Sequence, residues 1–220
     1  MADKAKKDSK ALNAELENAL FDDVERCELF FTQHWKPIVA VALAVVVAIT
    51  AAFALHTRSA RRNLAAAERL SAAVSIADLE KALTADPDAP GADMARYRLA
   101  GKYIDSKEYD KALKTLAVIS AGPDKTLRGK ARMVEAYVYE LTGKTAEAAR
   151  KFLTLSSSAE LPPAGQLEAS YAAGRLCIKL GRKDEAKSVL NKAAAIAIPQ
   201  ESPSAWYWKS QVTELLRCLD

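Results

Sequence analysis

One pattern occurs three times in this sequence: Tyr109-Asp110-Lys111-Ala112, Thr145-Ala146-Glu147-Ala148 and Lys183-Asp184-Glu185-Ala186. The last alanines of these stretches lie 36 and 38 residues apart. In the second and third stretches a glycine, Gly143 or Gly181, stands five residues before the alanine and marks a turn. Self-similarity at such a fixed spacing predicts a repeated unit of two helices joined by that turn.

Each of the three alanines has companions at fixed distances. A small residue lies twelve positions earlier, a tyrosine or cysteine three positions after that small residue, and a bulky apolar residue four positions after the alanine. In chain order these companions are Ala100, Tyr103 and Leu116; Ala136, Tyr139 and Phe152; and Gly174, Cys177 and Leu190. Small residues on two facing helices let them pack closely, and a large residue fills the space beside them.

These offsets resemble the tetratricopeptide repeat, a helix-turn-helix unit of about 34 residues. The resemblance implies an all-α fold in which at least three units stack into a solenoid with a continuous core. Because the spacing is longer here, we expect inserted loop residues around Ala121-Gly122-Pro123 and Leu161-Pro162-Pro163.

Two flanking segments extend the predicted stack. A helical region runs from Arg58 to about Ala85, and its end resembles the second helix of a unit without a clean first helix; that end contains Leu79, Ala82, Leu83 and Pro87. The segment Ser204–Leu219 follows a Ser-Pro pair and is expected to close the stack as a terminal helix. Its apolar residues, expected to cover the last repeat, are Trp206, Trp208, Leu215, Leu216 and Leu219.

The stretch Ile38–Leu55, IVAVALAVVVAITAAFAL, has eighteen residues without a charge, and Thr50 is its only polar side chain. At about 1.5 Å per residue a helix of this length spans roughly 27 Å, close to the thickness of a bilayer's hydrocarbon core. Trp35 and Lys36 suit one interface, and Pro37 suits a first helical turn. We therefore predict a single transmembrane helix at 37–57, an N-terminal tail at 1–36 and a repeat domain at 58–220.

A cleaved signal peptide is the main alternative to an anchor, because Ala52-Phe53-Ala54 resembles a cleavage site. The apolar run is longer than the ~7–15 residues of a signal sequence, and 36 residues precede it, which favours an uncleaved anchor. The tail is predicted to be disordered over its first ten residues. After them it carries an acidic amphipathic segment whose apolar stripe contains Leu12, Leu16, Leu20, Val24, Cys27 and Phe31.

Charge does not settle which way the chain crosses a membrane. Close to the span, the C-terminal side carries Arg58, Arg61, Arg62 and Arg69, whereas the N-terminal side carries two basic residues. Counted over the whole tail, however, the N-terminal side carries six basic residues. The net charge of +4 divides into −2 before the span and +6 after it. That excess is spread along the helices, so we expect no nucleic-acid binding.

The residue inventory argues against an enzyme, a metal site, a bound cofactor or a small-molecule substrate. The two histidines, His34 and His56, flank the apolar stretch, which leaves the repeat domain without a histidine base or zinc ligand. Gly143-Lys144-Thr145 is similar to the end of a phosphate-binding loop, but Val138 stands where the first glycine is required, so we interpret it as a repeat turn. We interpret the carboxylates of Glu135, Glu140 and Glu147 as solvated helix faces.

The resemblance also implies a binding surface. In tetratricopeptide stacks the first helices of the units line a concave groove that binds peptides. Tyrosine and methionine are adaptable contact residues there, and an arginine adds a partner for a carboxylate. The groove-facing offsets of the repeat fall on Met94, Tyr97, Met133, Tyr137, Tyr171 and Arg175. For any one of these residues the alternative is simple packing against a neighbouring helix.

The layout as a whole resembles a family of ancillary subunits of the bacterial SecYEG translocon. The features that carry the resemblance are the short acidic tail with Phe30-Phe31-Thr32-Gln33, one anchor and divergent helical repeats. It implies a cytoplasmic tail, periplasmic repeats, and association with the translocon, periplasmic chaperones or emerging polypeptides at the inner membrane. The tail here is longer than in that family, and the arginines after the span fit its topology poorly.

Two other functions remain open from the sequence. The first is a structural repeat subunit of another envelope machine, such as outer-membrane assembly or cell division. The second is a cytosol-facing receptor on an organelle membrane that grips targeting peptides with its repeats. The arginines after the span favour the second alternative, and the layout favours the bacterial ones. For Cys177 and Cys218 we expect no structural disulfide.

Overall fold

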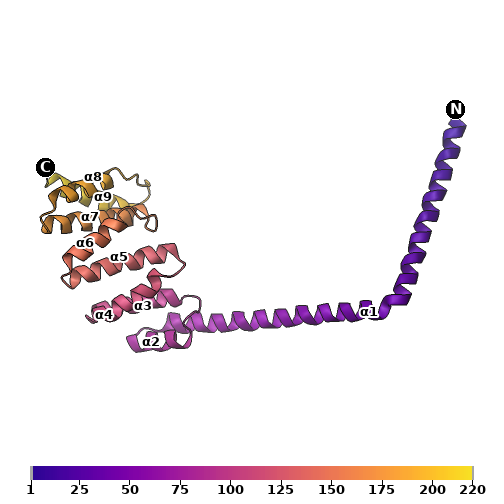
Figure 1. The fold of residues 1–220 in the computed structure, drawn as a ribbon, viewed down its shortest axis with the longest axis horizontal. Helices are drawn as coiled ribbons and strands as arrows, with labels where there is room; N and C mark the ends of the chain where they lie inside the picture. The colour runs from indigo at the N-terminus through magenta and orange to yellow at the C-terminus, as the bar shows by residue number, and fades with distance from the viewer. Residues whose placement is uncertain (1, 220) are drawn as a thin grey trace. The chain divides into compact units, whose positions relative to one another are not determined.

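The computed structural model describes the backbone of residues 2–219 and the side chains of residues 35–37 and 39–219. All of the regular structure in this described part is α-helical (Figure 1). The helices are α1 (Ala2–Ala72), α2 (Ile76–Ala85), α3 (Ala92–Asp105), α4 (Tyr109–Ser120), α5 (Lys125–Leu141), α6 (Thr145–Leu155), α7 (Pro163–Lys179), α8 (Lys183–Ala194) and α9 (Pro203–Arg217). The chain forms two compact units, Met1–Arg61 and Arg62–Asp220.

The first unit is made by α1, which contains the apolar stretch. From Val39 to Leu55 every side chain is exposed, and Phe53 is 69% exposed. The hydroxyl of Thr50, the only polar group there, donates to the carbonyls of Val46 and Val47 at 2.9 Å each. α1 is thus long and apolar enough to cross a bilayer, with the stretch's one hydroxyl satisfied within the helix.

Three details of this region differ from expectation. Residues 2–10, expected to be disordered, are helical. Pro37, expected in a first turn, lies inside α1, where its missing N–H removes one backbone hydrogen bond. The helical region expected to run from Arg58 to Ala85 is broken between Ala72 and Ile76.

The break after Ala72 has a clear physical cause. Ser75 accepts a hydrogen bond from the amide of Asp78 at 3.1 Å, and the Asp78 carboxylate accepts one from the Ser75 amide, which together form a capping box. The Ser75 hydroxyl also donates to the Asp78 carboxylate at 2.6 Å, and this bond, together with the one from the Ser75 amide, lowers the pKa of Asp78. On the other side of the break, the guanidinium of Arg98 donates to the carbonyls of Leu70, at 3.2 Å, and Ala73, which closes the end of α1.

The second unit is a series of helix-turn-helix pairs. α3 pairs with α4, α5 with α6 and α7 with α8, and successive pairs pack on one another (Figure 1). The alanines that define the repeat and their small and bulky companions are all buried: Ala100, Ala112, Leu116, Ala136, Ala148, Phe152, Gly174, Ala186 and Leu190. The predicted all-α, tetratricopeptide-like architecture is therefore confirmed.

An additional pair precedes these three. The last turns of α1 bury Ala66 and Leu70, and Leu70 shares a core with Leu79 of α2 and Ala95 of α3. The incomplete unit recognised in the sequence thus takes its first helix from the end of α1. At the other end, α9 packs against α7 and α8 as predicted. Trp206 departs from that prediction because it is 51% exposed, whereas Trp208, Leu215, Leu216 and Leu219 pack on the core.

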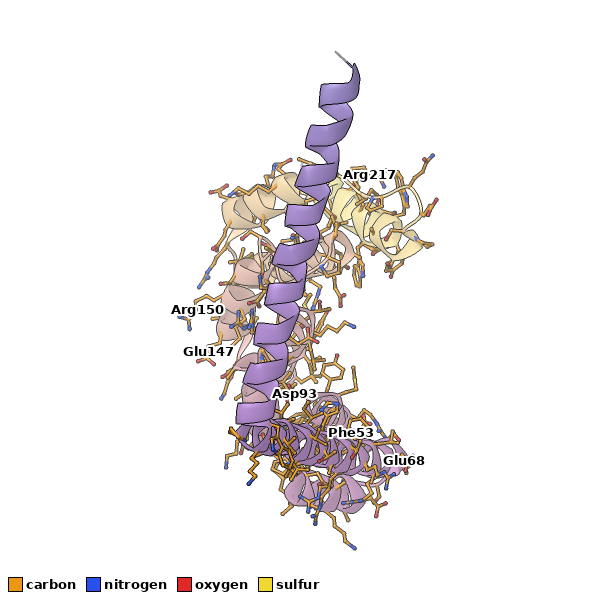
Figure 2. The ribbon with its side chains drawn as sticks, turned by 90° about the vertical axis from the view of Figure 1, so that its right-hand side faces the viewer. Phe53, Glu68, Asp93, Glu147, Arg150 and Arg217 are labelled. Atoms are coloured by element: carbon orange, nitrogen blue, oxygen red, sulfur yellow. The ribbon has the colours of Figure 1, made fainter. Side chains whose placement is uncertain are left out.

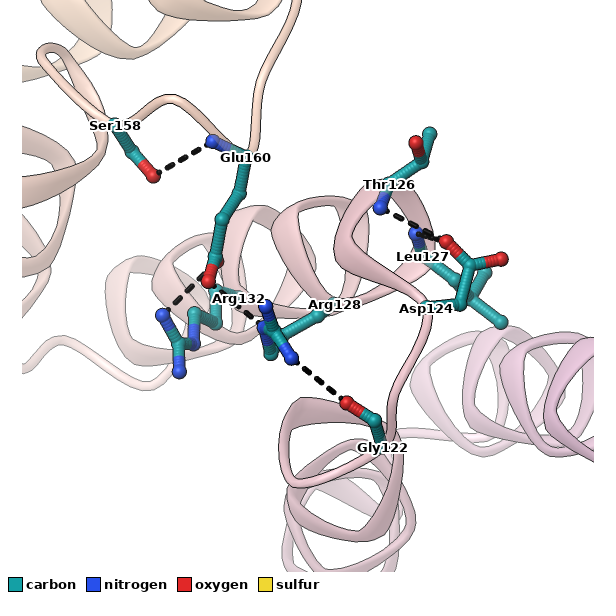
Figure 3. Close-up of polar contacts among 8 residues, drawn as sticks. All are labelled: Gly122, Asp124, Thr126, Leu127, Arg128, Arg132, Ser158 and Glu160. Carbon is teal, nitrogen blue, oxygen red and sulfur yellow. Dashed lines mark hydrogen bonds and ion pairs between the residues drawn. The ribbon is translucent and has the colours of Figure 1, made fainter.

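The loops expected between units are present and are tied together (Figure 3). Arg128 of α5 donates through Nη1 to the carbonyl of Gly122 at 2.8 Å and through Nε to Glu160 at 2.7 Å. Arg132 also binds the Glu160 carboxylate, at 2.9 Å. Because the Arg128 and Glu160 side chains are only 21% and 18% exposed, these charge-assisted bonds join the α4–α5 loop to the α6–α7 loop with little competition from water.

The turn inside each pair has the same backbone structure in all three units. The amides of Glu108, Lys144 and Arg182 donate to carbonyls five residues earlier, at 2.8, 2.9 and 2.8 Å. The residue before each amide has a positive φ, which is +77° at Gly143 and +76° at Gly181. In the first unit this position is Lys107, at +60°. In each unit a residue in the left-handed region ends the first helix, and the amide after it bonds a carbonyl of the last turn that would otherwise lack a partner. Only the first unit has a residue other than glycine at this left-handed position.

Lys107 is therefore a position where the sequence is not optimal for the turn. Lys107→Gly is expected to raise the free energy of unfolding by about 1 kcal/mol, because a side chain in the left-handed region costs roughly that amount. Urea unfolding of the full chain in detergent, with an unchanged slope, measures the effect. The matched control is Gly143→Ala, expected to lose about the same amount, since an added Cβ meets nothing within 4 Å and only φ differs. Equal stability of Lys107→Gly and the parent chain would show that this turn carries no strain.

Candidate binding face

The six residues expected in a groove lie on the first helix of each pair, and we call them the first-helix face. α3 carries Met94 and Tyr97, α5 carries Met133 and Tyr137, and α7 carries Tyr171 and Arg175. Their exposure differs. Met94 is 52% exposed and Arg175 is exposed, the three tyrosines are half-buried, and Met133 is only 7% exposed. The face available for contact is therefore built mainly from tyrosine edges, one methionine and one arginine.

Tyr137 is the most constrained of these side chains. Its ring packs edge-on against Phe152, with centroids 4.8 Å apart, and its hydroxyl donates to Glu168 of α7 at 2.8 Å. Burial and the hydrogen bond to Glu168 raise the pKa of Tyr137 well above its ordinary value. Burial, together with the charge of Glu168, also raises the pKa of Tyr97 on α3. Both phenols therefore stay protonated. The Glu168 carboxylate raises the pKa of one tyrosine in each of the two preceding units.

Arg175 is not a free cation. Its two terminal nitrogens contact the two carboxylate oxygens of Glu140 on α5, at 2.7 and 2.8 Å. The hydrogen bond that Arg175 donates to Glu140 also raises the pKa of Arg175. Because the Arg175 side chain is 43% exposed, this pair is worth no more than about 1 kcal/mol. A carboxylate on a partner would thus compete with Glu140 at modest cost.

Aromatic side chains continue the first-helix face beyond the three repeats. The ring of Tyr171 lies 5.7 Å from that of Trp208 on α9, and Trp208 lies 5.1 Å from Tyr207. Trp208 is half-buried, whereas Tyr207 is 57% exposed. α9 therefore does more than cover the last repeat, since it adds an exposed aromatic side chain next to the Tyr171 end of the face.

Two carboxylates that order this face were not predicted from the sequence. Glu140 was interpreted as a solvated side chain, and Glu168 was not singled out. Their spacing in the sequence could have indicated these contacts. Glu140 and Arg175 lie 35 residues apart, and Tyr137 and Glu168 lie 31 residues apart. Groups separated by about one repeat length face each other on adjacent units.

Another surface of the second pair, around Tyr139 and Lys151, is mostly charged. Lys144 and Lys151 lie over the ring of Tyr139, with nitrogens 5.4 and 4.9 Å from its centroid, and Lys151 also pairs with Glu135 at 2.8 Å. Open clefts of about 400 and 440 Å³ flank Lys151. Glu147 and Arg150 point outward from α6 (Figure 2). Most of these cations are neutralised by neighbouring carboxylates or held on an aromatic ring.

The described residues do not assemble a metal-binding cluster. No group of three or more histidine, cysteine, aspartate and glutamate side chains placed to hold a metal occurs among them. Gly143-Lys144-Thr145 forms the turn between α5 and α6, in agreement with its interpretation as a repeat turn. Cys177 is a buried free thiol whose pKa is raised to about 11 by burial and by Glu185, which makes it a poor nucleophile. Cys218 is an exposed free thiol.

Comparison with known proteins gives similarity in structure only. No family profile matches the chain, and proteins of known function give no sequence match. A crystal structure described as a kinesin light chain with nearly identical TPR-like repeats, from Podosopora anserina, matches with a TM-score of 0.47 and 16% identity, over 66% of this chain and 84% of that one. A point variant of that protein matches with a TM-score of 0.48 and 17% identity, over 66% and 82%.

Proposed function

We propose that this chain is a non-enzymatic, membrane-anchored adaptor that binds protein partners through the first-helix face. The observation that supports the proposal is the make-up of the first-helix face. Tyr137 is held by packing on Phe152 and by its hydrogen bond to Glu168, and Tyr171 packs against Trp208, yet the three tyrosines remain partly exposed. Rigid tyrosines supply contact area at a low cost in conformational entropy, and the exposed Met94 adds an adaptable apolar contact.

The anchor in this proposal is the apolar part of α1. Eighteen uncharged residues, a satisfied hydroxyl at Thr50, and Trp35 and Lys36 before the span support a single crossing of the bilayer. A helix so exposed and so apolar is unfavourable in water, because burial of its surface would be worth roughly 25 cal/mol per Å². The bilayer supplies that burial.

We further propose that the adaptor works at the protein translocon of a bacterial inner membrane, with a cytoplasmic tail and periplasmic repeats. Support comes from the layout of acidic tail, one anchor and divergent repeats. The anchor and tail would associate with channel subunits, and the repeats with chaperones or emerging polypeptides. Confinement to the membrane plane raises the effective concentration of the face near the channel, so weak and exchangeable contacts suffice.

One observation favours a second candidate function. Arg58, Arg61 and Arg62 follow the span directly, and positively charged residues are enriched on the cytosolic side of membrane helices. Under this alternative the repeats face the cytosol and bind targeting peptides on an organelle membrane. A role in another envelope machine has no residue-level support of its own.

The adaptor proposal is tested by site-specific photo-crosslinking in cells. A photoreactive residue placed at Tyr97 or Tyr171 is expected to capture secreted chains or periplasmic chaperones. One placed at Phe31 in the tail is expected to capture channel subunits. The matched control is Val118 on α4, which is 52% exposed but lies on the second helix of its pair, and little capture is expected there.

Two outcomes would contradict the proposal. Equal capture of the same partners at Val118 and at Tyr97 would show that the first-helix face is not selective. Capture of only outer-membrane assembly or division proteins, unchanged by deleting the span, would remove the translocon from the proposal. Capture of cytosolic proteins alone would support the organelle receptor instead.

A further inference from the structure

Three arginines stand on one side of α1 just after the apolar stretch. Arg58, Arg61 and Arg62 are separated by three and one residues, which at about 100° per residue places them within roughly 100° of one another around the helix. All three are exposed, and α1 remains helical through them. We call these residues the arginine stripe.

Among the residues whose side chains the structure describes, no carboxylate neutralises the charge of the stripe. Between Leu55 and Glu68 the sequence has no acidic residue. In the part of the chain whose side chains are described, no carboxylate forms an ion pair with any member of the stripe. Arg69, further along α1, differs because it pairs with Asp86 at 2.7 Å. The stripe is therefore a concentrated positive surface that still needs anionic partners.

The position of the stripe matches the headgroup layer of a bilayer that α1 crosses. With a rise of about 1.5 Å per residue, Arg58 lies about 4.5 Å beyond Leu55 along the helix, and Arg62 about 10 Å beyond it. The headgroup layer is roughly 5–8 Å thick on each side. Side chains on an α-helix lean toward its N-terminus, which here is the direction of the membrane, so the long arginine side chains reach back into that layer.

We propose that the arginine stripe binds the phosphate groups of anionic phospholipids in the leaflet next to the repeats. A guanidinium forms paired, charge-assisted hydrogen bonds with a phosphate, a geometry that the point charge of a lysine does not offer. Each such residue near an anionic surface contributes about a fivefold preference. The inference rests on the proposed span. It also accounts for the arginines whichever way the chain crosses the membrane.

The test measures lipid preference in bilayers that hold the full chain. The protein is reconstituted in phosphatidylcholine containing a minority of phosphatidylglycerol. Spin-labelled versions of both lipids then report the fraction immobilised at the protein. We expect phosphatidylglycerol to be favoured by about fivefold or more at low salt, which is at least the preference given by one such arginine. In the triple variant Arg58→Gln, Arg61→Gln and Arg62→Gln the ratio should fall close to one.

The control removes three positive charges elsewhere. Lys102→Gln, Lys114→Gln and Lys130→Gln change the net charge equally on exposed repeat positions and should leave the lipid preference intact. Absence of any immobilised lipid would mean that α1 does not span, which refutes the anchor and with it the inference. Immobilised lipid with no preference, or a preference that survives the arginine changes, would overturn the inference. An equal loss in the lysine control would also overturn it, because the effect would then follow net charge.

Discussion

Replacing Phe152 by alanine is expected to lower the free energy of unfolding by about 3–5 kcal/mol, the range for deleting a fully buried phenylalanine. Phe152 is 0% exposed and lies in the core cluster shared by α5, α6, α7, α8 and α9. Its ring also supports Tyr137 at a centroid distance of 4.8 Å. The cavity would thus weaken the core and remove the packing that holds a tyrosine of the first-helix face.

The measurement is urea unfolding of the full chain in detergent, followed by tryptophan fluorescence in a background with Trp35→Phe and Trp206→Phe, so that Trp208 alone reports on the α7–α9 end. The matched control is Leu141→Ala. This change also removes an apolar side chain from the second pair, but one that is 59% exposed, and it should cost less than about 0.5 kcal/mol. Similar costs for the two variants would show that the Phe152 position does not organise the core. Because each repeat contacts mainly its neighbours, α2 and α3 should be the least affected.

Much of this architecture could be predicted from spacing alone. The residues that defined the repeat, such as Ala112, Ala148 and Ala186, are all fully buried, because close approach of two helices tolerates only small side chains at the crossing. Gly143 and Gly181 marked their turns, since glycine enters the left-handed region without cost. Lys107 occupies the same position, but a lysine carries no such signal, and only the backbone reveals it.

The details of the binding face were less predictable because they depend on neighbours across repeats. The repeat offsets placed Met133 on the face, yet packing against the next unit buries it. Arg175 was expected to be available, yet Glu140 occupies both of its terminal nitrogens. The apolar character of Trp206 suggested a covered side chain, and the register of α9 exposes it instead. Each difference depends on the neighbouring helix that packs against the residue. The spacing of residues within one unit does not specify that neighbour.

Gly129 is the site of the second large effect, and its sequence context gives little warning of it. The residue lies inside α5, where a glycine normally weakens a helix and alanine would stabilise it. A Cβ added at Gly129, however, would stand 2.7 Å from the carbonyl oxygen of Glu160 and 3.0 Å from a methyl carbon of Leu161. The first of these is a backbone atom, so a side-chain rotation cannot relieve the contact.

Gly129→Ala is therefore expected to destabilise the chain by about 1–3 kcal/mol, the usual cost of overpacking. To make room, the α6–α7 loop would have to move away from α5. That movement would stretch the bonds from Arg128 and Arg132 to Glu160, which fix the loop at 2.7 and 2.9 Å (Figure 3). Hydrogen exchange should show faster exchange of the loop amides as well as lower global stability.

The control is Gly101→Ala in α3, where an added Cβ meets no atom within 4 Å. This variant should gain about 0.5–1 kcal/mol, because alanine loses less backbone entropy than glycine on folding. The same chemical change thus has opposite signs at two helical glycines, and the sign is set by the backbone of a loop that follows Gly129 by about thirty residues. A gain in stability at both positions would show that the α6–α7 loop yields freely and that the arginine clamp on Glu160 does not hold it.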